Sequence, residues 1–189
     1  YIYVYYPFER PDTSCVNRVS RWVLEPTANT VSLASETVLI DNIHSTAGNH
    51  NGGDVGFGKD GYLYISVGDG GCDYAGNSGC QGSNDASRDE HVLIGKVLRI
   101  TKDGNIPASN PFQGAGTARC NVTGSTTPGN RCQETYARGF RNPFRMAFDP
   151  NAPATRFFVN DVGEGAWEEI DLGTSGADYG WNCREGAHT

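Results

Sequence analysis

Short apolar runs separated by turn residues are the feature of this sequence that most limits its fold. Runs rich in Val, Ile, Tyr and Phe recur along the chain, and Gly, Pro, Asn or Asp divides each from the next. No long window has the 3.6-residue spacing of an amphipathic helix, and residues 82–96 carry their apolar residues at one end, which predicts a loop with one helical turn. The sequence therefore predicts an all-β fold, with strands at residues 1–8, 18–24, 36–40, 62–69, 95–100, 134–140, 145–148, 156–162 and 168–172.

Two segments of the chain share one sequence pattern. Each has an aromatic residue, then a turn rich in Asp, Asn or Gly, then an apolar strand that ends near Gly and Asp; Phe57 begins the first and Phe148 the second. The two starting points are separated by about twice the roughly 40–50 residues of one propeller blade. This repeat favours a β-propeller, and a β-sandwich is the alternative architecture.

Charge and length exclude some classes of protein. Acidic residues outnumber basic ones by 22 to 15, and the formal net charge of −7 disfavours a general nucleic-acid-binding protein. No apolar run approaches the roughly 18–20 residues of a membrane-spanning helix. The 189 residues suffice for one domain with a hydrophobic core. Because the chain begins at Tyr1 without a Met, we expect a processed or excised piece.

The six cysteines fit no zinc site, because no two of them have CxxC spacing. Two pairs of cysteines each flank a polar, glycine-rich segment that resembles a loop closed at its base. An even number of cysteines favours disulfides in an oxidising compartment, and free thiols in a cytosolic protein are the alternative. The sequence predicts the pairs Cys72–Cys80 and Cys120–Cys132, which leaves Cys15 and Cys183 as the remainder.

A histidine lies among glycines and amides directly before a predicted strand. The glycines around His50 let a ligand approach the backbone closely. If residues 53–57 and 62–67 pair as a hairpin, Asp69 falls at the same end of the hairpin as His50. A carboxylate there would fix the imidazole tautomer and raise its basicity, as a general base requires. The alternative is a simple turn around Asp69 and a solvent-facing loop histidine.

Two further polar segments are candidates for a site. Arg141 and Asn142 precede Pro143, which favours an extended backbone, and a guanidinium binds carboxylate or quinone oxygens well. Carboxylates and glycines are interspersed over residues 161–171 and again near residues 176–181, which suits Ca²⁺ and its about six to eight oxygen ligands. The alternatives are a structural ion pair for Arg141 and a solvated acidic loop for the carboxylates.

Taken together, these motifs resemble one family. In chain order they are HNGGDVGFGKDGYLYISVGDGG, LIGKVLRITKDGNIPASNPF, ARGFRNPFRMAFDP and DVGEGAWEEIDLGTSGADYGW, over roughly residues 36–186. They are similar to the motifs of the soluble quinoprotein glucose/sorbosone dehydrogenases, and the hedgehog-interacting-protein-like propellers share several of them. The resemblance implies a six-bladed β-propeller of four-stranded antiparallel blades, with pyrroloquinoline quinone and calcium as cofactors.

The resemblance also implies a reaction and the residues that perform it. His50 falls at the general base and Asp69 at the carboxylate that supports it, while Arg141 and Asn142 fall against the cofactor. The implied reaction takes the proton from the anomeric hydroxyl of an aldose and transfers hydride from C1 to the quinone, and a lactone leaves. Electrons then pass to an external acceptor.

The metal ligands that the resemblance implies lie in the acidic segment. Calcium beneath the quinone would take the backbone carbonyls of Gly163 and Glu164. A further structural calcium would take Glu169 and backbone oxygens near Tyr179, with Glu185 as an additional candidate. Glu164 departs from the Pro or Gln common at its position in the family, which leaves the role of its carboxylate open. Asn49 likewise replaces an Asp that some members have before the base.

The length implies that the propeller is partial. At about 45 residues per blade, residues 1–189 would form one domain of roughly three blades, a fragment of a longer chain. Open blade edges would favour self-association. The cysteines and the resemblance predict a secreted or periplasmic protein without a membrane span. The alternative function is a redox-silent extracellular propeller that binds a protein or a carbohydrate.

Overall fold

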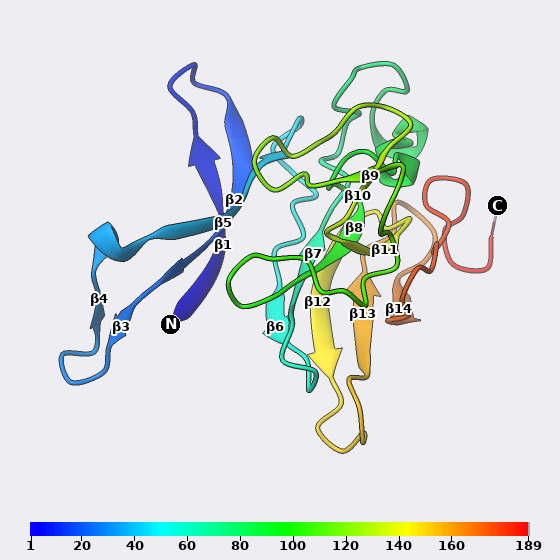
Figure 1. The fold of residues 1–189 in the computed structure, drawn as a ribbon. Coiled ribbons are helices and arrows are strands. Elements are labelled where there is room, and N and C mark those ends of the chain that lie inside the picture. Colours follow the sequence, from blue (N-terminus) through cyan, green and yellow to red (C-terminus); the bar gives the residue numbers. More distant parts are fainter. Residues whose placement is uncertain (189) are drawn as a thin grey trace.

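Three antiparallel sheets follow one another along the chain in the computed structural model, which describes residues 1–188 (Figure 1). The first sheet has the order β1-β2-β5, formed by β1 (Ile2–Glu9), β2 (Cys15–Trp22) and β5 (Thr37–His44). The second has the order β11-β8-β7-β6, formed by β6 (Val55–Phe57), β7 (Leu63–Val67), β8 (Lys96–Ile100) and β11 (Thr135–Arg138). The third consists of β12 (Pro143–Phe148), β13 (Phe157–Asp161) and β14 (Glu169–Leu172) in that order.

Short elements decorate the connections between these sheets. The other regular elements in the described residues are two pairs of short strands and three single-turn 3₁₀ helices. They are β3 (Leu24–Glu25) with β4 (Thr30–Val31), β9 (Thr117–Ala118) with β10 (Arg131–Cys132), and the turns Leu33–Ser35, Gln81–Ser83 and Ala86–Arg88. No helix in the described part of the chain is long and apolar enough to cross a membrane.

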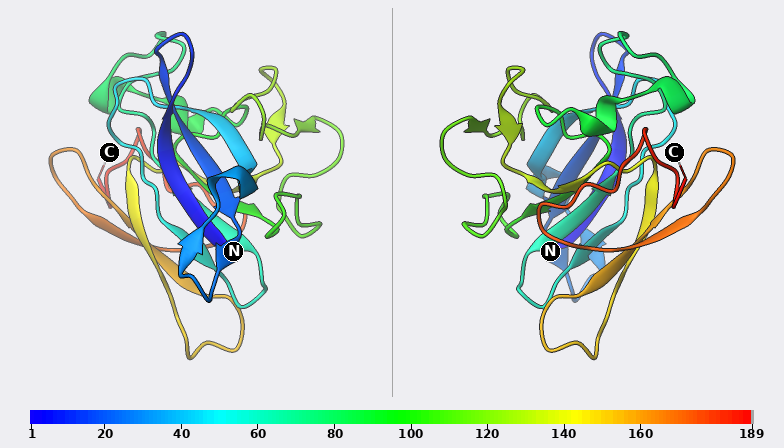
Figure 2. Two further views of the ribbon diagram at one scale, coloured as in Figure 1. Left: turned by 90° about the vertical axis from the view of Figure 1, so that its left-hand side faces the viewer. Right: turned by 90° about the vertical axis from the view of Figure 1, so that its right-hand side faces the viewer.

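The second sheet is buried on both faces, because every residue of β7 and β8 is buried. Leu63, Ile65 and Val67 pack with Val19 and Ile40 of the first sheet in one core cluster. On the opposite face of β7, Tyr64 packs in a second cluster with residues of the third sheet, Phe157 and Val159. A sheet that alternates side chains between two cores lies between two neighbours, as a middle propeller blade does. Figure 2 shows the three sheets as successive layers.

The β-propeller prediction is confirmed, with roughly three blades in this chain. The two echoed segments both form antiparallel hairpins, β6–β7 and β12–β13, in successive blades. Only the middle blade has four strands among the described residues; the first and third have three each. Each predicted strand is present, and residues 82–96 form a loop, as predicted, with the helical turn Ala86–Arg88 inside it and the end of the turn Gln81–Ser83 at its start.

The largest departure from the predicted strands is β5, which continues to His44 past the polar residues Asp41 and Asn42. Asn42 has a φ of 57°, and the register between β2 and β5 shifts along the strand. An irregular strand of this kind lacks the regular apolar alternation from which a strand is predicted.

Both predicted disulfides are confirmed, Cys72–Cys80 and Cys120–Cys132. The two cysteines left over by these pairs, Cys15 and Cys183, do not bond to each other, because both are free and exposed. Cys15 begins β2 of the first blade, whereas Cys183 lies in the segment after the third blade. Elimination could not predict this, since the count of cysteines carries no information about distance in space.

Removal of the buried Cys120–Cys132 bond should destabilise the protein. The bond joins residues 12 apart, so the double variant Cys120→Ala/Cys132→Ala should lower the free energy of unfolding by about 2–4 kcal/mol, because the unfolded chain gains freedom. Urea denaturation measures this change. The matched control is Cys15→Ala, an exposed free thiol whose loss should change the free energy by no more than about 0.5 kcal/mol. Equal losses in both variants would contradict the assignment.

Candidate functional site

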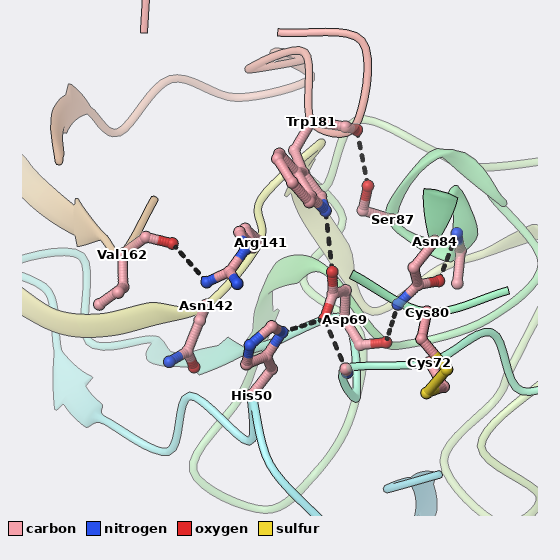
Figure 3. A network of polar contacts seen from close by, with 12 residues as sticks. His50, Asp69, Cys72, Cys80, Asn84, Ser87, Arg141, Asn142, Val162 and Trp181 are labelled. Atoms are coloured by element: carbon pink, nitrogen blue, oxygen red, sulfur yellow. Dashed lines mark hydrogen bonds and ion pairs between the residues drawn. A yellow bond between two sulfur atoms is a disulfide. The ribbon is translucent and has the colours of Figure 1, made fainter. Parts of the chain in front are cut away.

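The β6–β7 hairpin brings His50 against Asp69, as Figure 3 shows. Backbone bonds continue past the strands, since Gly53 N donates to Ser66 O (2.9 Å) and Gly70 N donates to His50 O (3.3 Å). His50 adopts a φ of 48°, which turns its segment at this point. Nδ1 of His50 lies 2.8 Å from Oδ1 of Asp69, so the ring is oriented by a carboxylate. With Nδ1 as the donor, the lone pair of the imidazole is on Nε2.

Asp69 is fully buried, and both of its carboxylate oxygens are hydrogen-bonded. In addition to His50, Oδ1 accepts the N–H of Gly71 (2.8 Å), and Oδ2 accepts the indole N–H of Trp181 (2.8 Å). A buried carboxylate needs such donors, because charge is costly to remove from water without them. Trp181 was not among the predicted site residues. Its only signal in the sequence is the Tyr-Gly-Trp motif, and nothing there indicates contact with Asp69.

A second buried carboxylate, Asp161, holds the Arg141–Asn142 segment. It accepts the backbone N–H groups of Arg141 (2.9 Å) and Asn142 (2.6 Å). Burial raises the pKa of Asp161 to about 7, although the two backbone bonds act to lower it. Asp161 ends β13, and sequence reasoning placed it in the acidic segment without a role of its own.

The Arg141–Asn142 segment adjoins the histidine segment directly. Asp69 N donates to Arg141 O (2.8 Å), and Oδ1 of Asn142 accepts the N–H of Gly52 (3.0 Å). A Cβ on Gly68 would clash with the carbonyl of His50, so glycine is needed for this approach. The structure thus brings all four of these predicted residues, His50, Asp69, Arg141 and Asn142, into one network (Figure 3).

Arg141 has donor capacity that the protein leaves unused. One terminal nitrogen donates to the carbonyl of Val162 (3.2 Å), and the guanidinium carbon lies 5.4 Å from the centre of the Trp181 ring. Nε of Arg141 is buried and has no partner among the described residues. A buried, unpaired donor on a cation fits an oxygen-rich anionic ligand.

The loop after β13 is organised by Glu185. Its Oε1 accepts four successive backbone N–H groups, those of Glu164 (2.6 Å), Gly165 (3.0 Å), Ala166 (3.0 Å) and Trp167 (3.1 Å). The bonds from Ala166 and its neighbours lower the pKa of Glu185 to about 2. The carboxylate of Glu164 is also engaged, because its Oε1 accepts the N–H of Gly82 (3.0 Å).

The remaining predicted metal ligands lie on or beside β14. Glu169 and Asp171 point to one face of this strand, and burial raises the pKa of both, that of Asp171 to about 6. Oδ2 of Asp171 is buried and has no hydrogen-bond partner within residues 1–188. The hydroxyl of Tyr179 donates to the carbonyl of Leu172 (2.5 Å), which ties the Tyr179 segment to the same strand.

Side chains alone do not form a dense metal cluster in the described residues. The one grouping of three close His, Cys, Asp or Glu ligand atoms there is Cys120, Cys132 and Glu134, and its two sulfurs form a disulfide. Backbone carbonyls are also ligands that Ca²⁺ takes.

Comparison with known proteins places the chain in a family. Residues 1–188 match the family model described as Glucose / Sorbosone dehydrogenase. The HIPL2 protein of Arabidopsis thaliana is 33% identical over 179 residues, which are 86% of this chain and 23% of that protein. The aldose sugar dehydrogenase YliI of Escherichia coli (strain K12) is 31% identical over 136 residues, 72% of this chain and 30% of that protein.

A solved structure shares the fold. The PQQ-bound form of aldose sugar dehydrogenase from Streptomyces coelicolor has a TM-score of 0.65 and 26% identity, over 91% of this chain and 42% of that chain. The chain thus spans less than a third of the two curated relatives and less than half of this structure. With a family match across residues 1–188, this chain belongs to the glucose/sorbosone dehydrogenase family.

Proposed function

We propose that the protein oxidises an aldose sugar to its lactone, with bound pyrroloquinoline quinone and calcium and with His50 as the general base. The observation that carries this proposal is the His50–Asp69 pair, in which a fully buried carboxylate orients the imidazole at 2.8 Å. The family and the similarity to the Escherichia coli aldose sugar dehydrogenase support a sugar dehydrogenase. The similarity to the PQQ-bound Streptomyces coelicolor protein supports the quinone as cofactor.

In the proposed step, two hydrogens leave the sugar by different routes, one as a proton and the other as a hydride. Nε2 of His50 accepts the proton of the anomeric hydroxyl, so the O–H bond breaks as the carbon–oxygen double bond forms. The C1–H bond breaks in the same step, and pyrroloquinoline quinone, when bound, supplies the acceptor for that hydride. Asp69 stabilises the imidazolium that results, because its carboxylate lies directly on Nδ1.

Arg141 and Asn142 are the residues of this chain that would hold the cofactor. The unpaired Nε of Arg141 is a cationic donor in a buried position, which suits the oxygens of an anionic quinone. Asn142 is fixed beside His50 through Gly52 and Asp161. The buried partners of both residues keep them in place before a ligand arrives.

Calcium would be held by the loop after β13 and by β14. The carbonyls of Gly163 and Glu164 are the proposed ligands at the quinone. Glu169 and Tyr179 are proposed for a structural ion, with Asp171 beside them, whose unpartnered buried oxygen fits a cation. The carbonyl of Val162, directly before the carbonyls of Gly163 and Glu164, accepts a hydrogen bond from the Arg141 side chain. A cation bound by the loop would therefore lie near Arg141 and would stabilise negative charge there.

Turnover also implies partners. An external acceptor would remove the electrons after each oxidation. We propose a location outside the cytosol, which the two disulfides support because such bonds persist best in an oxidising compartment. Self-association through the third blade is also proposed, because Ile170 and Leu172 are exposed on its edge strand β14.

The assay that tests this function uses the purified protein with added calcium and pyrroloquinoline quinone. Glucose and other aldoses are supplied as substrates, and an artificial dye serves as the electron acceptor. We expect sugar-dependent dye reduction that a calcium chelator abolishes. No dye reduction with any aldose would favour the alternative, a propeller that binds a protein or a carbohydrate.

Replacement of His50 should separate catalysis from cofactor binding. His50→Ala should lower kcat by about 100-fold to 10,000-fold, the usual contribution of a general base, and should leave the quinone affinity within about threefold. Dye reduction measures kcat, and quinone absorbance measures the affinity. The control is His91→Gln, whose ring bonds the Tyr74 hydroxyl rather than Asp69. An active His50→Ala variant would remove the proposed base.

Replacement of Asp69 should act through the histidine. In Asp69→Asn the side-chain N–H₂ faces either the indole N–H of Trp181, or both the N–H of Gly71 and Nδ1 of His50, so two donors oppose each other in either orientation. We expect kcat to fall by about 100-fold or more, because the amide carries no charge to stabilise the imidazolium and no longer holds one tautomer firmly. Asp89→Asn, which affects a carboxylate bonded to the Tyr74 hydroxyl, is the charge-matched control. Equal kcat values for the two variants would contradict a supporting role for Asp69.

A further inference from the structure

A single carboxylate oxygen collects the N–H groups of the loop between β13 and β14. Four successive peptides, from Gly163–Glu164 to Ala166–Trp167, donate to Oε1 of Glu185 at 2.6–3.1 Å. The loop residues are exposed, so water would otherwise compete for these donors. Convergence of consecutive N–H groups on one anion defines the backbone conformation of the whole loop.

The opposite side of the same peptides carries the carbonyl groups. A trans peptide is planar, and its C=O points opposite to its N–H. Because the N–H groups of Glu164 and Gly165 point at Glu185, the carbonyls of Gly163 and Glu164 point away from it. The carboxylate thus gives the loop a face of N–H groups on one side and a face of carbonyl oxygens on the other. Outward carbonyl oxygens are the type of ligand that Ca²⁺ takes.

This geometry separates Glu185 from the cation. Oε1 already lies where four N–H dipoles converge, a place that repels positive charge. A calcium bound by the outward carbonyls at about 2.3–2.6 Å would lie on the far side of the peptides from the carboxylate. Glu185 can therefore act on the ion through the loop backbone.

We propose that Glu185 is a positioning residue that orients the carbonyls of Gly163 and Glu164 for calcium, and is not a ligand of that ion. This inference rests on the proposed function, and it gives Glu185 a role different from the one that the family resemblance implied, which was that of a ligand of the separate structural calcium. Two contacts steady the loop from other directions. The Glu164 carboxylate accepts a hydrogen bond from the N–H of Gly82, and the carbonyl of Val162 accepts one from the Arg141 guanidinium.

The test compares Glu185→Gln with Glu168→Gln in the purified protein. Both variants remove one negative charge from the same loop region, but the carboxylate of Glu168 makes only one contact there, 3.4 Å from the N–H of Gly163. Tb³⁺ is the calcium probe, because the exposed indole of Trp167 in the loop can sensitise its luminescence. Trp167→Phe identifies the part of the signal that comes from the loop site.

Two readouts are expected to change together in Glu185→Gln. Without metal, hydrogen exchange of the amides of residues 164–167 should accelerate by about tenfold, since each loses a charge-assisted bond. Tb³⁺ affinity at the loop should fall by about 10–100-fold, the usual effect of losing a group that orients metal ligands. In Glu168→Gln both quantities should stay within about threefold of the wild type. Both effects should be larger in Glu185→Ala than in Glu185→Gln, because Gln keeps a neutral side-chain oxygen that can accept the N–H groups and Ala does not.

Three results would overturn the inference. Weaker Tb³⁺ binding with unchanged amide exchange would make Glu185 a ligand. Faster amide exchange with unchanged Tb³⁺ affinity would show that the loop conformation does not govern the site. A wild-type signal that is insensitive to Trp167→Phe would remove calcium from this loop altogether. That last result would also withdraw the proposed quinone-side calcium, whereas the His50 variants test the base independently.

Discussion

The buried carboxylate of Asp69 is the interaction on which the rest of the site depends. An ionised carboxylate without water needs hydrogen-bond donors on both oxygens, and Asp69 obtains them from three segments, at His50, Gly71 and Trp181. The residues that satisfy Asp69 are thereby held against one another. Orientation of the imidazole is a consequence of this requirement, and so is the burial of the Trp181 ring beside Arg141.

The internal repeat has a structural counterpart in the two blades that it covers. Each repeated hairpin leads to a buried aspartate, Asp69 after β7 and Asp161 at the end of β13. The first aspartate binds a side chain, His50, and the second binds the backbone of Arg141 and Asn142. Blade packing brings the two aspartates to one network, because β12 leads from the Arg141 segment and contacts β7. One architectural unit, used twice, thus supplies the buried carboxylates that hold His50 and the Arg141–Asn142 segment.

The carboxylates of Asp161 in the third blade and of Glu185 in the segment after it are bound by backbone N–H groups. Glu185 is neutralised by four N–H groups, and Asp161 by two, with no Lys or Arg side chain bonded to either carboxylate among the described residues. Where a carboxylate accepts the N–H groups of a segment, the carbonyls of that segment point in other directions. The carbonyl of Val162, for example, accepts a hydrogen bond from the Arg141 side chain. A chain with a net charge of −7 can in this way direct both N–H donors and carbonyl oxygens to defined places within a few residues.

Local patterns in the sequence determined the strands, the two hairpins, the disulfides Cys72–Cys80 and Cys120–Cys132, and the proximity of His50 to Asp69 across one hairpin. Such features depend on residues close together in the chain, where strand period and turn chemistry decide the geometry. Only the tertiary structure decided that Trp181 donates to Asp69, that Asp161 holds the Arg141 segment, that Glu185 binds the loop amides and that Cys15 and Cys183 stay apart. These contacts follow from how the blades stack, and blade stacking depends on core packing between segments far apart in the sequence.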